Sequence, residues 1–453
     1  MQSKCINVIT LREKIFYGFG DMASNLIFQY ISIFLLFFYT DIFGITAAAA
    51  GTLLLVSRIF DAINDPIIGS LVDNTRSRWG KFRPYLLYGS IPLAVFTILC
   101  FSTPQLSQSY KLLYAYITYI GLGVSYTFVN IPYSAMTAVI TQDPQKRSEL
   151  SSVRMVFAVI GALVVVSTAQ PIVSALGRSN RQLGFLFSSI IFAFLSLLLF
   201  WLCFGMVKER VRAAEKQKIG ILKIWYVLKS NTPLIIVSTA FMFDLTAYTI
   251  STSSTLYYFK YNIGNEALNT IYLLISILSM ITGMLFVPML SRRLGKRNAA
   301  VLGLIVVIIS CIGIYFTPYK NITLILIWAG ISGIGYALPT ALSWAMVPDT
   351  VEYGEWKTGL RTEGIIYSTY SFAQKLATAI GGAAAALILE LTGYIPNQVQ
   401  SSTALKGILL NMTLVPAGFM ILTIIIISFY RLDDNSFYEI LASIDQNKAK
   451  GSM

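Results

Sequence analysis

The chain has 453 residues, of which 56% are hydrophobic and only 12% are charged, and its formal net charge is +13. A soluble protein has about a quarter of its residues charged, so this composition excludes the soluble class and indicates an integral membrane protein. The positive charge does not require a nucleic-acid partner, because membrane proteins concentrate lysine and arginine in their cytoplasmic loops.

Apolar stretches long enough to cross a bilayer as helices recur along the whole chain. We predict twelve spans, at 14–40, 47–72, 84–104, 111–140, 149–175, 183–206, 231–259, 268–290, 298–316, 321–347, 363–391 and 405–430. The polar flanks of the first span indicate that it is retained rather than removed as a signal peptide. We expect an all-α membrane protein with six-helix bundles at 1–206 and 231–432, a cytoplasmic linker at 207–230 and a cytoplasmic tail at 433–453.

The second span contains two acidic residues in the middle of an apolar segment. Asp61 and Asp65 are one helical turn apart, so both side chains fall on one face, and Asn64 lies within the same turn. A carboxylate at this depth is costly and commonly binds a cation or relays a proton. Arg58 offers the alternative of a purely structural ion pair, but one arginine does not neutralise two carboxylates. The pattern therefore favours a cation site.

Polar and charged side chains also occur inside other spans. They are Asp21 and Asn25 on one face of span one, Tyr126, Asn130 and Ser134 with the adjacent Thr127 in span four, Arg154 in span five, Asp244 in span seven and Lys375 in span eleven. This inventory suits a polyhydroxylated solute bound next to a cation. A single amide or hydroxyl more often bonds helix to helix, whereas an intramembrane charge such as Lys375 is a functional candidate.

The loops indicate how the halves are related. The linker is basic, and its stretch 219–228 fits either an amphipathic helix on the membrane surface or a solvated tether. The turns at 76–83 (RSRWGKFR) and 291–297 (SRRLGKR) place a central glycine among basic residues at equivalent positions. This recurrence supports two parallel six-span repeats, although short cytoplasmic loops are commonly basic in any case.

The connection between spans ten and eleven, at 348–357, is the acid-rich cytoplasmic stretch. It contains Asp349, Glu352 and Glu355, and it faces basic loops that include Arg292 and Arg293. Ion pairs between these groups would close the inner entrance of a transporter. Exposed pairs are individually weak, so a solvated loop is an equally good interpretation.

Lysine and arginine fix the orientation of the chain. With both termini in the cytoplasm, 25 of these 34 residues lie on the cytoplasmic side, 6 lie outside and 3 lie within spans. That asymmetry satisfies the positive-inside rule. The four cysteines share no spacing and the chain has no histidine, so we interpret the cysteines as small apolar residues and expect neither a metal site nor a cofactor.

Several short motifs identify a family. They are Tyr17-Gly-Phe-Gly-Asp21, RIFDAINDP at 58–66, RSRWGKFRP at 76–84, Asn130-Ile-Pro-Tyr133, DTVEYGE at 349–355 and GYIPNQVQ at 393–400. With these the whole chain resembles the glycoside, pentoside and hexuronide cation symporters of the major facilitator superfamily, which include bacterial melibiose and glucuronide carriers. The resemblance implies the major facilitator fold and a multi-pass protein of the bacterial cytoplasmic membrane.

The resemblance also implies roles for individual residues. Asp61, Asn64, Asp65 and Thr127 match the cation-site positions of the melibiose carrier. Arg154 and Lys375 match charged residues of its cavity, Tyr126 matches a tyrosine of its sugar site, and Asp21 lies in a shared motif. Three positions depart, because Asn25 and Asn130 replace sugar-binding aspartates and Ser134 replaces a tryptophan. Both asparagines look like the glucuronide carrier, as does Trp344.

We therefore expect coupled uptake of a sugar glycoside, of the hexuronide type, with Na⁺ or H⁺, by a monomer in a lipid bilayer and without chemistry on the substrate. A symporter of neutral glycosides or pentosides and a proton-driven exporter are the transporter alternatives, and a membrane-embedded enzyme is the alternative from another class. No phosphate-binding loop of the P-loop type occurs in the sequence, which argues against ATP-driven transport.

Overall fold

The computed structural model describes residues 9–432 apart from 76, 142–143, 179, 211–227 and 360–362, together with residues 437, 439–440 and 443. Side chains at 58–59, 62–63, 66, 70, 73–74, 138, 144–145, 147–148, 152 and 363–364 lie outside this description. The described residues form helices and their connections. Among them, eleven helices are long and apolar enough to cross a membrane. The predicted membrane class is confirmed.

The chain divides into two compact units, Met1–Lys216 and Gln217–Met453. The first contains α1 (Leu11–Phe37), η1 (Phe38–Phe43), α2 (Ala47–Asn74), α3 (Arg83–Tyr88), α4 (Ser90–Cys100), α5 (Gln108–Ile140), α6 (Pro144–Gly177) and α7 (Arg181–Met206). The predicted stretch 219–228 and most of the tail lie outside the described residues, apart from Leu228 and a few tail positions.

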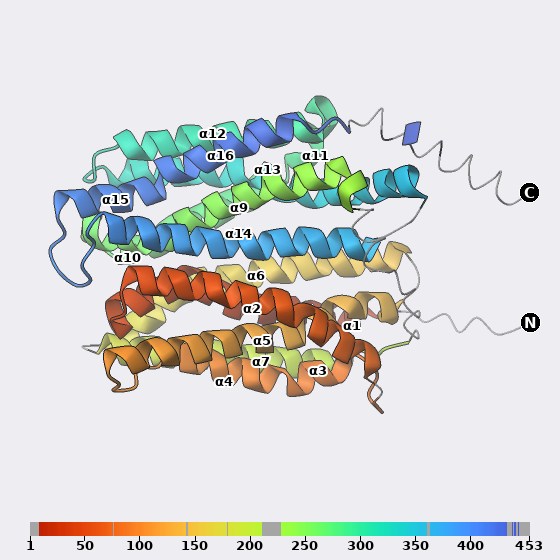
Figure 1. Cartoon of the computed structure of the whole chain (residues 1–453), viewed down its shortest axis with the longest axis horizontal. Coiled ribbons are helices and arrows are strands. Elements are labelled where there is room, and N and C mark those ends of the chain that lie inside the picture. The colour runs from red at the N-terminus through yellow and green to blue at the C-terminus, as the bar shows by residue number, and fades with distance from the viewer. Residues whose placement is uncertain are drawn as a thin grey trace, which may run out of the picture. The chain divides into compact units, whose positions relative to one another are not determined.

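The second unit also begins with a long helix and a π-helical segment, but different spans are divided into two helices. It contains α9 (Thr232–Tyr257), η2 (Tyr258–Ile263), α10 (Ala267–Met284), α11 (Val287–Leu294), α12 (Lys296–Phe316), α13 (Ile322–Thr358), α14 (Glu363–Leu391), α15 (Ser402–Met412) and α16 (Leu414–Ser428). Within each unit the long helices lie side by side as a bundle (Figure 1).

The packing partners within the two units correspond. In the first unit α1 packs against α6 and α7, α2 against α5, and α4 against α7. In the second unit α9 packs against α14 and α16, α10 against α13, and α12 against α16. Each pair in one unit thus has its counterpart in the other, which is the arrangement that parallel internal repeats produce.

Aromatic side chains fill part of the core of the first unit. Tyr30 of α1 lies 4.5 Å from Phe101 and 5.0 Å from Phe192, measured between ring centroids, and its hydroxyl donates to the Phe185 carbonyl over 3.2 Å. All four side chains are buried. Aromatic rings that pack edge to face or at a tilt fix one another's positions, so this cluster holds α1 in a defined register against α7.

The first helix of each unit ends in the same irregular turn. η1 and η2 are six-residue π-helical segments, and each is followed by a glycine with φ of 81°, Gly44 in one unit and Gly264 in the other. The next backbone N–H reaches back across the turn in both cases, from Ile45 to the Tyr39 carbonyl at 3.0 Å and from Asn265 to the Phe259 carbonyl at 2.9 Å. Positive φ is the conformation that glycine adopts without strain.

The two basic turns also have the same local structure. Arg83, at the start of α3, donates from Nη2 to the Phe204 carbonyl in the last turn of α7 over 2.5 Å. Arg297, in the first turn of α12, donates from Nη1 to the Tyr430 carbonyl just after α16 over 3.2 Å. In each unit an arginine beside the glycine turn therefore holds the end of the sixth span, and the equivalence predicted from sequence extends to side-chain contacts.

The start of the connection after α7 is tied to the first unit. The Glu209 carboxylate accepts backbone hydrogen bonds from Lys81, Phe82 and Arg83 at 2.8 to 2.9 Å. Arg210 forms a two-bond ion pair with Glu13 of α1, at 2.6 and 2.7 Å, and these bonds raise the pKa of the Arg210 guanidinium. A carboxylate that accepts N–H groups at the first turn of a helix also stabilises it through the helix dipole.

Some predicted boundaries differ from the structure. The stretch 348–357 is not a loop, because α13 continues as a helix to Thr358. Three predicted spans are each divided into two helices, at Gly89, at Leu285–Phe286 and at Thr413. The predicted second span corresponds to α2, which is helical over 28 residues.

Candidate functional site

The acidic pair of α2 faces one side of α5. The Thr127 hydroxyl donates a hydrogen bond to Asp65 Oδ1 over 3.0 Å. One turn earlier on α5, a Cβ atom on Gly123 would lie 2.7 Å from Asp61 Oδ1, so the Asp61 carboxylate lies directly against the Gly123 backbone. Asp61 and Thr127 are buried, with 5% and 3% of their surface exposed. The structure thus brings Asp61, Asp65 and Thr127 together between two packed helices.

Asn64 lies within the same turn of α2, and its Nδ2 atom is buried without a hydrogen-bond partner among the described residues. Two carboxylates, a hydroxyl and an amide therefore occupy one region of the α2–α5 contact. Oxygen ligands of this kind suit hard cations. Two carboxylates one turn apart repel each other when both are ionised, so a bound Na⁺ or H⁺ would relieve the repulsion. Arg58, the alternative partner, has a side chain outside the described residues.

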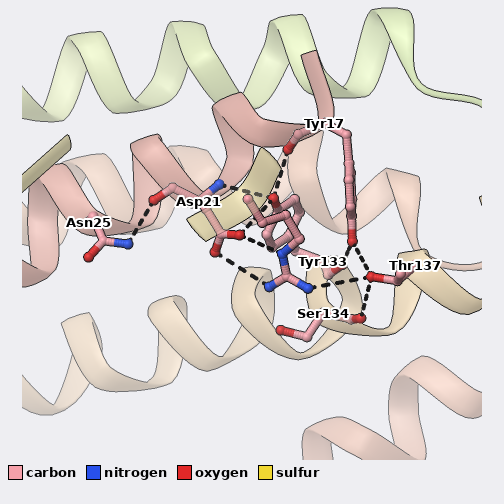
Figure 2. Close-up of polar contacts among 7 residues, drawn as sticks. Tyr17, Asp21, Asn25, Tyr133, Ser134 and Thr137 are labelled. Atoms are coloured by element: carbon pink, nitrogen blue, oxygen red, sulfur yellow. Dashed lines mark hydrogen bonds and ion pairs between the residues drawn. The ribbon is translucent and has the colours of Figure 1, made fainter. Parts of the chain in front are cut away.

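A second polar cluster joins α1, α5 and α6. Arg154 of α6 donates from Nε to Asp21 Oδ2 over 2.5 Å and from Nη2 to Asp21 Oδ1 over 3.4 Å. The Tyr133 hydroxyl lies 2.7 Å from the Tyr17 carbonyl and 3.2 Å from Asp21 Oδ2. Figure 2 shows Tyr17, Asp21 and Asn25 on one helix facing Tyr133, Ser134 and Thr137 on another.

Thr137 completes this cluster. Its Oγ1 lies 2.6 Å from the Tyr17 hydroxyl and accepts from Arg154 Nη1 over 3.4 Å. The guanidinium of Arg154 lies over the Tyr133 ring, 4.7 Å from its centroid, so the arginine interacts with a carboxylate and an aromatic face at once. The predicted substrate residues Asp21 and Arg154 are therefore each other's ion-pair partners.

The other predicted substrate residues of the first unit lie near this cluster along the chain but are not part of it. Asn25 donates from Nδ2 to the Asp21 carbonyl of its own helix over 3.0 Å. Tyr126 lies 6.5 Å from Phe28 between ring centroids. Asn130 is half-buried and Ser134 is exposed on α5. The one-turn spacing of Tyr126, Asn130 and Ser134 keeps these three side chains on one helix face.

In the second unit the predicted substrate residues come from α13 and α14. Trp344 lies 5.3 Å from Tyr370 between ring centroids, in an edge-to-face arrangement, and 43% of its surface is exposed. Lys375 is half-buried on α14, five residues after Tyr370. The second unit thus presents an exposed tryptophan ring and a half-buried lysine at the predicted positions, and their contact with a substrate stays a prediction.

One of the predicted gating residues forms an ion pair within the second unit. Asp349 is buried and forms an ion pair with Lys296 over 2.5 Å, inside the second unit. Glu352 and Glu355 are half-buried on the same helix, and Arg292 and Arg293 are exposed in the last turn of α11. The Lys296–Asp349 ion pair thus links the glycine turn at 295 to α13. Ion pairing between the two halves stays a prediction.

Sequence reasoning missed four residues of these clusters. Tyr17 and Tyr133 stand out in the sequence only as ends of motifs, and Thr137 and Gly123 carry no charge that would mark them. A signal was present, since Gly123 and Thr127 repeat on α5 the one-turn spacing of Asp61 and Asp65 on α2. When two packed helices each have polar or small residues one turn apart, the residues of one helix can contact those of the other at both turns.

The family model described as MFS/sugar transport protein matches residues 16–434. The chain belongs to this family. It is 40% identical over 448 residues to the uncharacterized symporter YnaJ of Bacillus subtilis, covering 98% of this chain and 97% of that protein. It is 36% identical over 443 residues to the glucuronide carrier protein homolog of Escherichia coli (97% and 96% covered), and 36% identical over 449 residues to the isoprimeverose transporter of Lactiplantibacillus pentosus (98% and 93%).

Among solved structures, a bacterial homologue of the human lysosomal transporter Spinster matches with a TM-score of 0.66 and 11% identity, covering 97% of this chain and 99% of that one. At this identity the likeness concerns the fold alone. The MFS/sugar transport family thus provides the major facilitator fold, and the chain is a multi-pass membrane transporter of the glycoside/cation symporter type rather than an enzyme.

Proposed function

We propose that this transporter carries a sugar glycoside together with Na⁺ or H⁺ into the cell across a bacterial cytoplasmic membrane, with both termini in the cytoplasm. The cation is held by Asp61, Asn64, Asp65 and Thr127. The observation that carries this proposal is the meeting of both α2 carboxylates with one face of α5, where Thr127 bonds to Asp65 and Gly123 gives room to Asp61.

We further propose that the sugar is a hexuronide or a related anionic glycoside. The charge of Asp21 is matched by Arg154, and Asn25 and Asn130 add amides rather than carboxylates, so these three positions do not repel an anionic sugar. Lys375 or Arg154 would take the sugar carboxylate as a charge-assisted partner, and Trp344 and Tyr126 would contact the sugar ring.

A neutral glycoside is the second candidate. One relative at 36% identity is named for a glucuronide and another at 36% for isoprimeverose, an uncharged disaccharide, so similarity gives neither substrate an advantage. The amides at 25 and 130, together with a basic partner for the carboxylate, favour the anionic sugar. A proton-driven exporter is the third candidate. It would move its substrate out of the cell as protons enter, whereas a symporter moves both inward.

Coupling would follow from the cation's effect on the acidic pair. Binding of a monovalent cation lowers the repulsion between Asp61 and Asp65, and a carrier whose sugar-bound state requires that relief binds the sugar more tightly when the cation is present. The loaded carrier then exchanges between outward-open and inward-open states in the manner of major facilitator transporters.

Counterflow in membrane vesicles tests the proposal. Vesicles loaded with an unlabelled glucuronide are diluted into the labelled compound, with and without a sodium gradient and at two pH values. We expect transient accumulation of label, increased by one cation, and no concentrative uptake in Asp61→Asn or Asp65→Asn variants that reach the membrane in normal amounts. Normal accumulation in either variant would reject the cation site, and counterflow of isoprimeverose but not of glucuronide would favour the neutral substrate.

A further inference from the structure

Asp244 is a buried carboxyl group halfway along α9, a helix long enough to cross the membrane. Only 7% of its surface is exposed, and its Oδ1 atom has no hydrogen-bond partner within the part of the chain that the structure describes. Its neighbours one turn away on α9, Ala240, Phe241 and Ala247, are buried and apolar. A carboxyl group placed in this way is not explained by helix packing, which gains nothing from an unpartnered polar atom.

Two of the phenols on neighbouring helices are near Asp244. Tyr336 of α13 and Tyr370 of α14 both lie within electrostatic range of its carboxyl group. The Tyr336 hydroxyl is itself buried and has no hydrogen-bond partner among the described residues. Tyr248 of α9 packs edge to face on the Tyr336 ring, with the centroids 5.3 Å apart, and so holds that phenol in place.

No described cation forms an ion pair with Asp244. The elements packed against α9 are α13, α14, α15, α16 and η2. Their described charged side chains are Asp349, Glu352, Glu355 and Lys357 on α13, Lys375 and Glu390 on α14, Lys406 on α15 and Lys260 on η2, with none on α16; the side chain of Glu363, the first residue of α14, lies outside the description. Lys260 contacts Asn397 instead, over 2.8 Å, and Asp349 contacts Lys296. Within the described residues the surroundings of Asp244 are therefore apolar and phenolic.

We propose that Asp244 is a proton-binding site of this transporter, additional to the acidic pair of α2. An ionised carboxylate without a cationic partner is very costly in an apolar setting, and such a group takes up a proton and becomes neutral instead. A hard metal cation needs several oxygen ligands around it, whereas a proton needs only the one carboxyl group that Asp244 provides. Carboxyl groups of this kind form proton relays in membrane transporters.

The site goes beyond the proposed function, because it holds whether the cation at Asp61 and Asp65 is Na⁺ or H⁺. A bound proton makes the α9–α13–α14 contact electrically neutral. Loss of the proton would place a negative charge among apolar helices, so any state of the carrier that opens this contact to water releases the proton more readily than a state that closes it.

Infrared difference spectroscopy on the full-length protein in liposomes tests the proposal, with the proton itself as the probe and no sugar or sodium present. We expect the C=O stretch of a protonated carboxyl group to be present at neutral pH, to disappear at alkaline pH and to shift in D₂O. Asp244→Asn should lose this band. Asp349→Asn should keep it, because Asp349 is equally buried, at 6% exposed, but is paired with Lys296.

A band that is absent from the wild type at neutral pH, or that is unchanged in Asp244→Asn, overturns the proposal. If the asparagine variant does not reach the membrane, Asp244→Glu replaces it, and its band should move to another frequency; an unmoved band overturns the proposal equally. Counterflow on the same liposomes separates the two claims, since failure to exchange any glycoside rejects the proposed function and leaves the Asp244 band intact.

Discussion

Arg154 and Asp21 join α6 to α1 through a hydrogen bond of 2.5 Å from Nε to Oδ2. Both side chains are mostly buried, with 20% and 16% of their surface exposed. Their opposite charges neutralise each other beside the Tyr133 ring, so neither charge is independent of the other. Removal of one partner leaves an uncompensated buried charge, whereas removal of both does not.

Arg154→Gln and Asp21→Asn should each destabilise the protein, by about 3 kcal/mol or more at full burial and less here because both groups retain contact with solvent. The double variant should be more stable than the sum of the single effects predicts. Thermal unfolding of the four proteins in detergent gives the coupling energy. Additive single effects would show that the ion pair contributes nothing of its own.

Thr127→Val keeps the shape of the side chain but removes the hydroxyl that bonds to Asp65. A hydrogen bond to a charged group contributes about 1.5–3 kcal/mol, so cation affinity should fall by about tenfold or more. Thr127→Ser, which retains the hydroxyl, is the matched control and should stay close to wild type. The measurement is the sodium or proton concentration at half-maximal stimulation of uptake; equal values in both variants would remove Thr127 from the site.

Gly123→Ala should displace the Asp61 carboxylate, because the new Cβ atom would lie 2.7 Å from Oδ1. Overpacking of this kind costs about 1–3 kcal/mol, which corresponds to about a tenfold loss of cation affinity if the site bears the strain. Gly205→Ala, at a position with open space in α7, is the control. Cation stimulation of counterflow should weaken in the first variant alone. An unaffected Gly123→Ala protein would place Asp61 elsewhere during transport.

Asn130→Asp should discriminate between an anionic and a neutral sugar. Two like charges at about 4 Å repel by about 4 kcal/mol at an effective dielectric constant of about 20, so competition by a glucuronide should weaken by up to about a thousandfold while competition by the matching glucoside stays similar. Asn180→Asp, at the N-cap of α7, where aspartate is as good a cap, controls for the added charge. An unchanged preference in Asn130→Asp would leave the neutral glycoside as the better candidate.

Glu209→Ala should destabilise the first unit, because three backbone N–H groups lose their common acceptor. The expected loss is about 2 kcal/mol or more. Lys208→Ala is the matched control, since only the backbone of Lys208 is recorded in a bond to Glu13, at 3.4 Å. Lower thermal stability of the first variant with normal stability of the second is the expected result. Equal stabilities would mean that water replaces the carboxylate without loss.

Hydropathy and the spacing of acidic residues predicted much of the fold and part of the site. Spans identified by apolar length coincide with the long helices, because backbone groups in a bilayer must bond within their own helix. Asp61 and Asp65 share a face of α2 because helical spacing fixes which side chains do so, whereas the position of Thr127 beside them was expected from the family resemblance alone.

Other features depend on packing that the sequence does not state. The stretch 348–357 was predicted as a loop because it is polar, yet α13 continues through it, and polar residues on a helix that leaves the membrane are simply solvated. Asp349 pairs with Lys296 beside the glycine turn, a contact within the second unit that the sequence pattern did not single out. The contact of Arg154 with the Tyr133 ring depends on how two helices pack against each other. The spacing of residues within one helix does not predict such a contact.

The paired π-helical turns before Gly44 and Gly264 bear on the history of the chain. The same irregular turn is less readily explained by two independent origins than by one. Its presence at the same place in both halves is therefore the result expected from duplication of a gene that encoded one six-helix unit. A mutational scan would then give parallel profiles at the two turns, with every side chain larger than hydrogen disfavoured at both glycines. The substitutions that are tolerated at one turn would then predict those that are tolerated at the equivalent positions of the other.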